Sequence, residues 1–439
     1  MLRRLLVLPL LLAMASPALA QTVKLGEAVR PGDHFRYELQ LTVDGKLKLE
    51  RDGKVQAMTM KGDATHKFAE RIEAADTGGA GGKAVRYYDV ARSSSTVAGD
   101  TNKRELANDR RLTVAVRTET DTLHVCPNGP FTREELELVA EHFDTLAIPA
   151  LLPNKELKAG ESWAVANEAA QHACQFDGLV KNDIKGSLID VKDGVATFKI
   201  EGQAEGVELG ATARVTVSAT GTFDVARGRI TGLVWEQTDD RNLGPASPAM
   251  EVKATARVVR IPLAEEPKEL SAEARAKVPA DKIPTEMTLL RLTDSDGKYS
   301  LTYPRGWSVV GQTGGHTVLR LVEMGTFLSQ ATITPWKQVD KGQHSAPADF
   351  KAALAKIPGW QPSEVLADAE MPTTDGRWVY KFSAKGKQDS ADVVQTFYLH
   401  AGPNGQQVAV TFLSEPAKAA KVSDREAELL KGIGFADRR

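Results

Sequence analysis

Apolar and polar residues alternate along much of the chain, a pattern that half-buried β-strands produce because successive side chains point to opposite faces of a sheet. Every second residue is apolar from Phe35 to Val43, and the longest clean alternation runs from Val207 to Ala219. Runs of this kind follow one another with few helical segments between them. This order predicts a strongly curved antiparallel sheet over the first half of the chain.

Asp-Gly dipeptides between these runs predict tight hairpin turns, because both central residues of a type I′ turn need positive φ. Asp44-Gly45 follows the first alternation, and Asp193-Gly194 separates two later runs. The chain is therefore expected to reverse direction at both places.

The spacing of apolar residues lengthens to three or four in several places, which predicts helices. Thr132 and Glu135 form the pattern of a capping box at the start of one helix. It is expected to run to Phe143 and to be the main helix of the first half. Ser423 and Glu426 form the same pattern near the C-terminus, where a final helix is expected.

A segment rich in proline and charge divides the chain. Proline removes a backbone donor and interrupts helices and sheets, so its repetition indicates a connector. The expected organisation is a signal peptide at 1–20, a β-rich curved-sheet domain at 21–261, a linker at 262–297 and a second domain at 298–439. The predicted fold class is α+β with antiparallel β-structure predominant.

The first residues have the three parts of a secretory signal peptide. Arg3 and Arg4 supply the positive start, Leu5–Met14 is an apolar run, and Ala18–Ala20 fits a cleavage site. The apolar run is shorter than the roughly 20 residues that span a bilayer, and no later run is long enough either. We therefore expect cleavage after Ala20, a periplasmic or secreted protein, and no integral membrane segment.

The second domain alternates strands with two helices, an order that predicts helices packed on an antiparallel sheet. Its opening, KYSLTYPRGWSVV from Lys298 to Val310, carries a strand, a Tyr-Pro-x-Gly-Trp turn and a second strand. This opening resembles that of domains with the Mog1/PsbP-like fold. The resemblance covers the chain from about Leu290 to Phe435. It implies an α/β sandwich and implies binding more than catalysis, and it brings no catalytic residue with it.

The first domain is more loosely similar to exported bacterial domains with a LolA-like curved sheet. The hairpin GTFDVARGRITGLVW and the order of the strands carry this resemblance. The sequence lacks the long hydrophobic helix that a lipid carrier would use as a plug.

The charge is nearly balanced, with 56 Lys and Arg residues, 58 Asp and Glu residues and a formal charge of −2. A protein that neutralises phosphate groups needs a basic excess, so nucleic acid is not an expected partner. The content of 42% apolar and 26% charged residues is typical of a soluble globular protein. No pattern in the sequence calls for a cofactor.

The two cysteines, Cys126 and Cys174, each follow a histidine two positions earlier. Two His-x-Cys pairs could supply four zinc ligands. The second pair, however, lies in a stretch with helical character, where residues two apart point to nearly opposite sides. An oxidising compartment favours pairing of thiols. We therefore predict a disulfide between Cys126 and Cys174, with free thiols as the alternative and a metal site as the least favoured.

Local motifs of catalysis are missing or misplaced. The sequence has no G-x-S-x-G, no H-E-x-x-H and no G-x-G-x-x-G that opens a helix. Its S-x-x-K, Ser295–Lys298, stands in an Asp-Gly turn rather than at a helix start. The favoured hypothesis is therefore a non-enzymatic protein acting in binding or envelope maintenance. A hydrolase whose site is assembled from distant residues and a purely structural complex-assembly factor are the alternatives.

A curved sheet has a concave face that a helix, a ligand or a partner must cover. The main helix is expected to be too short to cover the strand Val207–Ala219, so Leu209 and Val217 are candidate ligand contacts. The crossover that follows this helix is the alternative cover. Trp336 and Trp360, which are expected near loop ends of the second domain and therefore exposed, are further candidates. The expected ligand or partner is a hydrophobic small molecule or an envelope protein.

Overall fold

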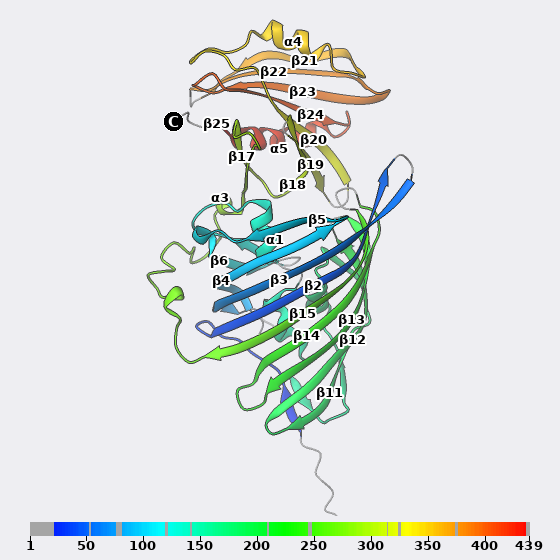
Figure 1. Cartoon of the computed structure of the whole chain (residues 1–439), viewed down its shortest axis with the longest axis vertical. Coiled ribbons are helices and arrows are strands. Elements are labelled where there is room, and N and C mark those ends of the chain that lie inside the picture. The colour runs from blue at the N-terminus through cyan, green and yellow to red at the C-terminus, as the bar shows by residue number, and fades with distance from the viewer. Residues whose placement is uncertain are drawn as a thin grey trace, which may run out of the picture.

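The computed structural model describes residues 22–51, 54–75, 81–118, 122–140, 143–208, 210–244, 248–313, 315–323, 326–373 and 376–435. Most of these residues lie in antiparallel strands, and few lie in helices. Figure 1 shows a large curved sheet, coloured blue to green, and a smaller sandwich coloured yellow to red. The predicted signal peptide lies outside the described residues. No helix in the described ranges has the length and hydropathy needed to cross a membrane.

The large sheet is one continuous antiparallel path that bends around its own concave side (Figure 1). In order across the sheet, its strands are β7 (Thr122–Val125), β6 (Leu112–Arg117), β4 (Gly81–Val97), β3 (Lys54–Ala75), β2 (His34–Arg51), β15 (Ala249–Leu263), β14 (Arg229–Arg241), β13 (Ala211–Asp224), β12 (Val195–Glu208), β11 (Lys185–Lys192) and β9 (Ser162–Ala164). Two further strands extend it, β5 (Asp100–Glu105) beside β4 and β10 (Gly178–Asn182) beside β12. The pairing confirms the antiparallel β-structure predicted from the alternation.

Short elements fill most of the concave side of this sheet. They are α1 (Arg133–Ala140), η2 (Thr145–Leu151), α2 (Asn167–Cys174), and the paired strands β1 (Val23–Leu25) and β8 (Lys155–Leu157). η2 contacts both β4 and β14, and its Ile148 and Leu151 are fully buried. The crossover therefore covers the sheet, as the alternative predicted. α1 and α2 are each eight residues long, and α2 confirms the helical character predicted for the stretch that ends at Cys174.

The start of α1 has the predicted capping box. The N–H of Thr132 donates to Glu135 Oε2 at 2.9 Å, and the N–H of Glu135 donates to Thr132 Oγ1 at 3.1 Å. Two of the N–H groups that a helix start leaves unpaired are thereby satisfied. The local sequence is sufficient to place this end of α1, which begins at Arg133.

The two Asp-Gly dipeptides behave differently. Asp193-Gly194 forms the predicted turn between β11 and β12, with φ of 51° and 78°. Asp44-Gly45 forms no turn, because β2 continues straight through it, so that prediction is wrong. A Cβ on Gly45 would lie 2.2 Å from the carbonyl oxygen of Glu251 on the neighbouring strand. This glycine therefore permits a close approach of two backbones rather than a reversal.

Residues 262–297, the predicted linker, pack against the convex face of the sheet. They include η3 (Lys268–Leu270) and α3 (Thr285–Thr288). Leu270 is fully buried in a cluster with Ala69, Val85 and Val114, and Lys83 Nζ donates to the carbonyl of Ala280 at 2.9 Å. The segment is therefore docked on the sheet, and the division into two domains stays a prediction.

The second sheet is antiparallel and carries a helix on each face (Figure 1). Its strands, in spatial order, are β18 (Trp307–Thr313), β19 (His316–Glu323), β20 (Thr326–Pro335), β24 (Gln407–Ser414), β23 (Ala391–Ala401), β22 (Trp378–Gln388) and β21 (Trp360–Met371). The helices are α4 (Pro347–Leu354) and α5 (Ala419–Lys431). On β23, Phe397 packs with the α4 cluster and Tyr398 with the α5 cluster, which places the helices on opposite faces.

A small sheet of β16 (Leu290–Thr293), β17 (Tyr299–Tyr303) and β25 (Ile433–Phe435) joins the two parts. Leu290 forms a parallel bridge with Phe131, and both side chains are buried in a core cluster that extends into each part. The N–H of Arg291 donates to the carbonyl of Phe131 at 2.8 Å. The apolar core is therefore continuous across the connection.

The predicted capping box near the C-terminus is wrong. α5 begins at Ala419, so Ser423 lies inside the helix, where its hydroxyl donates to the carbonyl of Ala420 at 3.2 Å. Glu426 turns to the sheet instead and accepts a hydrogen bond from Ser329 at 3.3 Å. Burial raises the pKa of Glu426 to about 7, because the charged form is poorly solvated there.

Candidate binding site on the concave face

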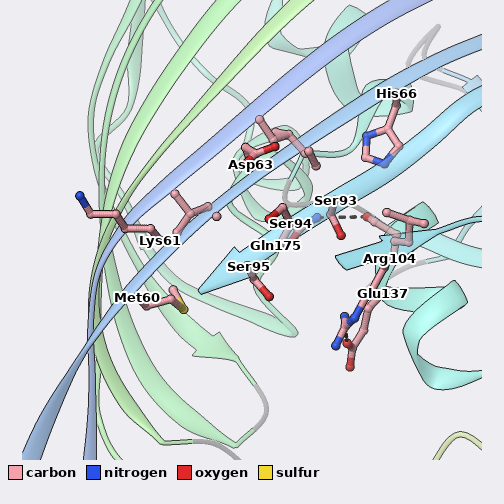
Figure 2. A pocket seen from close by; sticks show the side chains of 16 residues that line it. Met60, Lys61, Asp63, His66, Ser93, Ser94, Ser95, Arg104, Glu137 and Gln175 are labelled. Carbon is pink, nitrogen blue, oxygen red and sulfur yellow. Dashed lines mark hydrogen bonds and ion pairs between the residues drawn. The ribbon is translucent and has the colours of Figure 1, made fainter. Parts of the chain in front are cut away.

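A pocket of about 340 Å³ opens on the concave face between β2, β3, β4, β5 and the helix α1 (Figure 2). It is lined by Leu41, Val43, Met60, Lys61, Gly62, Asp63, Ala64, His66, Ser93, Ser94, Ser95, Arg104, Glu137, Leu138, Ala140 and Gln175. Side chains alternate along β3, so Met60 and its second neighbours face the pocket, whereas Lys61 lies on the other face. Figure 2 shows Lys61 pointing away from the pocket.

Small side chains on two adjacent strands leave this space. The register of the sheet places Gly62 between Val43 on β2 and Ser95 on β4. Ala64 is the next residue of β3 on the same face. Protein interiors normally fill to crystal-like density, so a row of glycine, alanine and serine beside open space distinguishes this end of the concave face.

His66 forms the inner wall of the pocket. The side chain is 1% exposed, and its ring meets Tyr88 edge-on, with 6.1 Å between the ring centroids. Burial lowers the pKa of His66 to about 4; a hydrogen bond with the backbone of Leu138 opposes this effect and the charge of Arg86 adds to it. The imidazole is therefore neutral and a weak base at neutral pH.

Arg104 and Glu137 form an ion pair at the rim (Figure 2). Arg104 on β5 is paired with Ser93, and its Nη1 lies 2.9 Å from Oε2 of Glu137 on α1. Gln175, at the end of α2, reaches the carbonyl of Ala140 at 3.5 Å. A charged rim therefore borders an apolar and small-residue wall.

Val217 and Leu209 were the predicted ligand contacts on the curved sheet. Val217 is 2% exposed and lies on the concave face of β13. The register across β14 and β15 places it in the same transverse row as Val43 of the pocket, but Val217 does not line the pocket. Val217 therefore lies on the same face as the pocket but several strands away, and its contact with a ligand stays a prediction. Leu209 lies outside the described residues. The prediction that Val207–Ala219 forms one strand is wrong, because β12 ends at Glu208 and β13 begins at Ala211, and Val207 pairs with Thr212 on the neighbouring strand.

The two predicted tryptophans lie in the second sheet, away from this pocket. Trp360 is 7% exposed and packs near Phe397, with 6.1 Å between ring centroids, so the expectation that it is exposed is wrong. Trp336 is half-buried and meets Phe350 edge-on at 5.3 Å. Both belong to the apolar cluster under α4.

Sequence reasoning missed the residues that line the pocket. Ser93–Ser95, a polar run inside a strand, and the small pair Gly62 and Ala64 were the available signals. These residues indicate a pocket only when the neighbouring strands are known. The turn wrongly predicted at Asp44-Gly45 divided β2, the strand next to Gly62 and Ala64, into two.

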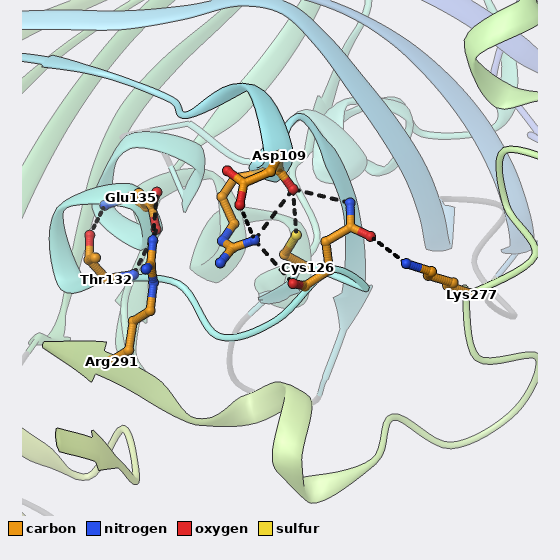
Figure 3. Close-up of polar contacts among 8 residues, drawn as sticks. Asp109, Cys126, Thr132, Glu135, Lys277 and Arg291 are labelled. Atoms are coloured by element: carbon orange, nitrogen blue, oxygen red, sulfur yellow. Dashed lines mark hydrogen bonds and ion pairs between the residues drawn. The ribbon is translucent and has the colours of Figure 1, made fainter. Parts of the chain in front are cut away.

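Cys126 and Cys174 are both free and buried, so the structure does not contain the predicted disulfide. Cys126 follows β7, and its thiol donates to the carbonyl of Asp109 at 3.9 Å (Figure 3). Cys174 ends α2, where burial, together with the charge of Asp239, raises the thiol pKa to about 12. The two thiols have different neighbours, and each is held in the protonated, unreactive form.

The histidines that precede these cysteines also have different surroundings. His172 Nδ1 lies 3.9 Å from Asp144 Oδ2, whereas His124 is buried beside Arg86 and Arg305, and burial followed by these charges lowers its pKa well below the usual range. Within the described ranges, no group of three or more His, Cys, Asp or Glu residues could hold a metal ion.

One serine of the second sheet lies close to a carboxylate. Ser329 Oγ donates to Glu426 Oε1 at 3.3 Å. The positive charge of the nearby Lys381 lowers the Glu426 pKa, which opposes the effect of burial. Nucleophilic catalysis needs the reacting carbonyl within reach of the serine oxygen. Ser329 is fully buried beneath α5, so a substrate has no access to this oxygen. The arrangement does not support the hydrolase alternative.

No protein-family model matches the chain, and no curated protein matches it. Among solved structures, the cyanobacterial PsbP of Synechocystis is 14% identical with a TM-score of 0.26, covering 34% of this chain and 93% of that chain. The Ran-binding protein Mog1p of Saccharomyces cerevisiae is 12% identical with a TM-score of 0.27, and the match covers 34% of this chain and 96% of that chain. Lipovitellin is 9% identical with a TM-score of 0.28, covering 54% of this chain and 26% of that chain.

The first two structures bear the name of the fold to which Lys298–Val310 was compared, and each covers about a third of this chain. The similarities are too distant to carry an argument about function. The proposal that follows therefore rests on the pocket itself.

Proposed function

We propose that this protein is a non-enzymatic binding protein that holds an apolar molecule, such as the hydrocarbon chain of a lipid, on the concave face of its large sheet. The pocket of about 340 Å³ beside Val43, Met60 and Gly62 carries the proposal. This volume falls within the roughly 300–1,000 Å³ typical of small-molecule sites, which are concave and mostly apolar.

The chemistry of the wall favours binding over catalysis. General acid–base catalysis needs a group whose pKa lies near the working pH and that reaches the reacting atom. His66 has a pKa of about 4 and is held at the inner wall. Arg104 and Glu137 are engaged with each other at the rim. The apolar part of the wall, which includes Val43 and Met60, offers contact area to a hydrocarbon chain.

The pattern of residues 1–20 supports the export part of the proposal. We place the protein in the periplasm or outside the cell, where it would meet the lipids and proteins of the envelope. An apolar ligand has low solubility in water, so a protein that covers it would allow its passage through this compartment.

The proposal is tested by filling the pocket. In the full-length protein, Gly62→Phe places a ring in the pocket, because a Cβ at Gly62 has only ordinary contacts, the nearest being the carbonyl oxygen of Ser94 at 3.5 Å. We expect Gly62→Phe to reduce binding of dodecanol at least tenfold. Lys67→Phe, which adds the same ring on the opposite face of β3 at a residue outside the pocket lining, should bind like the wild type. Equal binding by both variants and the wild type would contradict the proposal.

A second candidate function, complex assembly, is favoured by one observation on the second sheet. The edge strand β21 exposes three apolar side chains: Val365 (58%), Leu366 (46%) and Met371 (41%). An exposed strand edge with apolar residues is suited to pairing with an extended segment of another protein. Native mass spectrometry of the protein purified from its own host distinguishes the two functions, since it detects a small apolar ligand and a protein partner by their masses.

A further inference from the structure

Arg104, at the rim of the pocket, is a positively charged group that its protein neighbours satisfy only in part. Arg104 Nη1 lies 2.9 Å from Glu137 Oε2. Its Nε is buried and has no hydrogen-bond partner among the described residues. A guanidinium has five N–H donors in a planar fork, so this side chain retains donors for a further acceptor.

The position of Arg104 directs these donors to the pocket. Arg104 is paired with Ser93 across β4 and β5, so both side chains lie on the concave face. The neighbouring Lys103 is paired with Ser94 and lies on the opposite face. Arg104 therefore presents a cationic side chain to the pocket, and the small hydroxyl side chains of β4 lie beside it.

Glu137 is a displaceable partner. Its side chain is 50% exposed and that of Arg104 is 31% exposed. An ion pair of this exposure contributes little to stability, because water screens both charges. A ligand anion that bound Arg104 would release the Glu137 carboxylate to water, where it is well solvated.

We propose that the ligand is an amphiphile with an anionic head group, a carboxylate or a phosphate, whose hydrocarbon chain lies along Val43 and Met60 and whose head group binds Arg104 in place of Glu137. This inference rests on the proposed function and adds the class of ligand. A planar guanidinium can bind such a head group through two parallel N–H donors.

The experiment compares dodecanoate with dodecanol, which share a chain length and differ in the charge of the head group, by calorimetric titration of the full-length protein. A hydrogen bond to a charged group contributes about 1.5–3 kcal/mol, so dodecanoate should bind roughly tenfold more tightly than dodecanol or better. Arg104→Gln should bring the two affinities together. Glu137→Gln should strengthen dodecanoate binding severalfold, because it removes the competing carboxylate.

The matched control is Lys103→Gln, which removes one positive charge from the opposite face and should leave the preference for dodecanoate intact. A preference that Lys103→Gln abolishes and Arg104→Gln retains would overturn the inference, since net charge and not Arg104 would then cause it. Dodecyl phosphate, run in parallel, determines whether the head-group site accepts phosphate as well as carboxylate.

Two other results have separate meanings. If both ligands bind equally and Arg104→Gln changes neither affinity, the ligand class is wrong while the apolar pocket stands. If neither ligand binds the wild type, the proposed function is wrong and this inference falls with it.

Discussion

The two ends of the concave face are built on the same strands but differ in what fills them. At one end, Tyr37 on β2, Phe68 on β3 and Tyr88 on β4 form a run of rings, with 4.9 Å between the centroids of each neighbouring pair. At the other end, Gly62 and Ser95 occupy the corresponding face of β3 and β4, and the pocket opens. One sheet thus separates the residues that hold it folded from the residues that leave room for a ligand.

The charges at the two ends differ in the same way. At the filled end, Arg86 Nε lies 2.9 Å from Glu70 Oε2 and Nη2 lies 2.7 Å from Thr145 Oγ1, with both members of the ion pair nearly inaccessible. Removing one partner of a buried pair is strongly destabilising, because the other charge stays buried alone. At the open end, the pair Arg104–Glu137 is exposed and contributes little to stability. The open end can therefore exchange partners without loss of the fold.

The largest expected effect comes from removing a ring of the filled end. Phe68 is fully buried, so Phe68→Ala should lower the free energy of unfolding by about 3–5 kcal/mol. Val43→Ala, at the half-buried pocket wall on the neighbouring strand, should cost about 1 kcal/mol or less. Urea denaturation of the full-length proteins measures both. Similar losses for the two variants would show that the ends share one structural role.

The next effect is a pH dependence caused by His66. Its pKa is about 4 in the folded protein and about 6.5 when unfolded. The unfolded chain therefore binds a proton in this window and the folded protein does not, so the contribution of His66 is full above pH 6.5 and is lost as the pH falls to 4. The shift corresponds to about 3 kcal/mol.

This contribution is isolated by comparing the wild type with His66→Gln between pH 4 and 6.5, using denaturation midpoints. The stability difference between them should shrink as the pH falls, because the variant has no imidazole to protonate on unfolding. The comparison is needed because two buried carboxyl groups have the opposite effect. Burial raises the pKa values of Glu208 and Glu426 to about 7, so their contribution to the stability of the protein is lost as the pH rises from 4.5 to 7. Parallel profiles would mean that His66 does not titrate differently in the two states.

The smallest effect is expected for Gly62→Ala, for which Gly45→Ala on the same face is the comparison. A Cβ at Gly45 would lie 2.2 Å from the Glu251 carbonyl oxygen, whereas one at Gly62 would meet nothing closer than 3.5 Å. We expect Gly62→Ala to change stability by less than about 1 kcal/mol, with stabilisation as the expected direction. Gly45→Ala should destabilise, because two strands must separate. Thermal unfolding of both variants tests the ranking, and a more stable Gly45→Ala would contradict it.

Local sequence predicted what local contacts determine. The Thr132–Glu135 capping box is closed by hydrogen bonds between residues three apart, and the turn at Asp193-Gly194 needs only positive φ at two adjacent positions. The same two patterns failed at Ser423 and at Asp44-Gly45. At Ser423, Glu426 cannot close the capping box because its side chain is buried against the sheet and accepts a hydrogen bond from Ser329. At Asp44-Gly45, β15 pairs with β2 through both residues and keeps the strand extended.

The sequence by itself determined the antiparallel β-character and the start of α1, because these depend on the period of the apolar residues and on contacts a few residues apart. It did not determine where the strands end, since Val207–Ala219 is divided between β12 and β13 and β2 runs through Asp44-Gly45. Only the tertiary structure decided which residues form the pocket. Met60, Arg104 and Glu137 come from three elements, and they meet because the register of β3, β4 and β5 and the docking of α1 place them on one face. A shift of one residue in any register would turn these side chains to the other face, and no local pattern fixes that register over so long a strand.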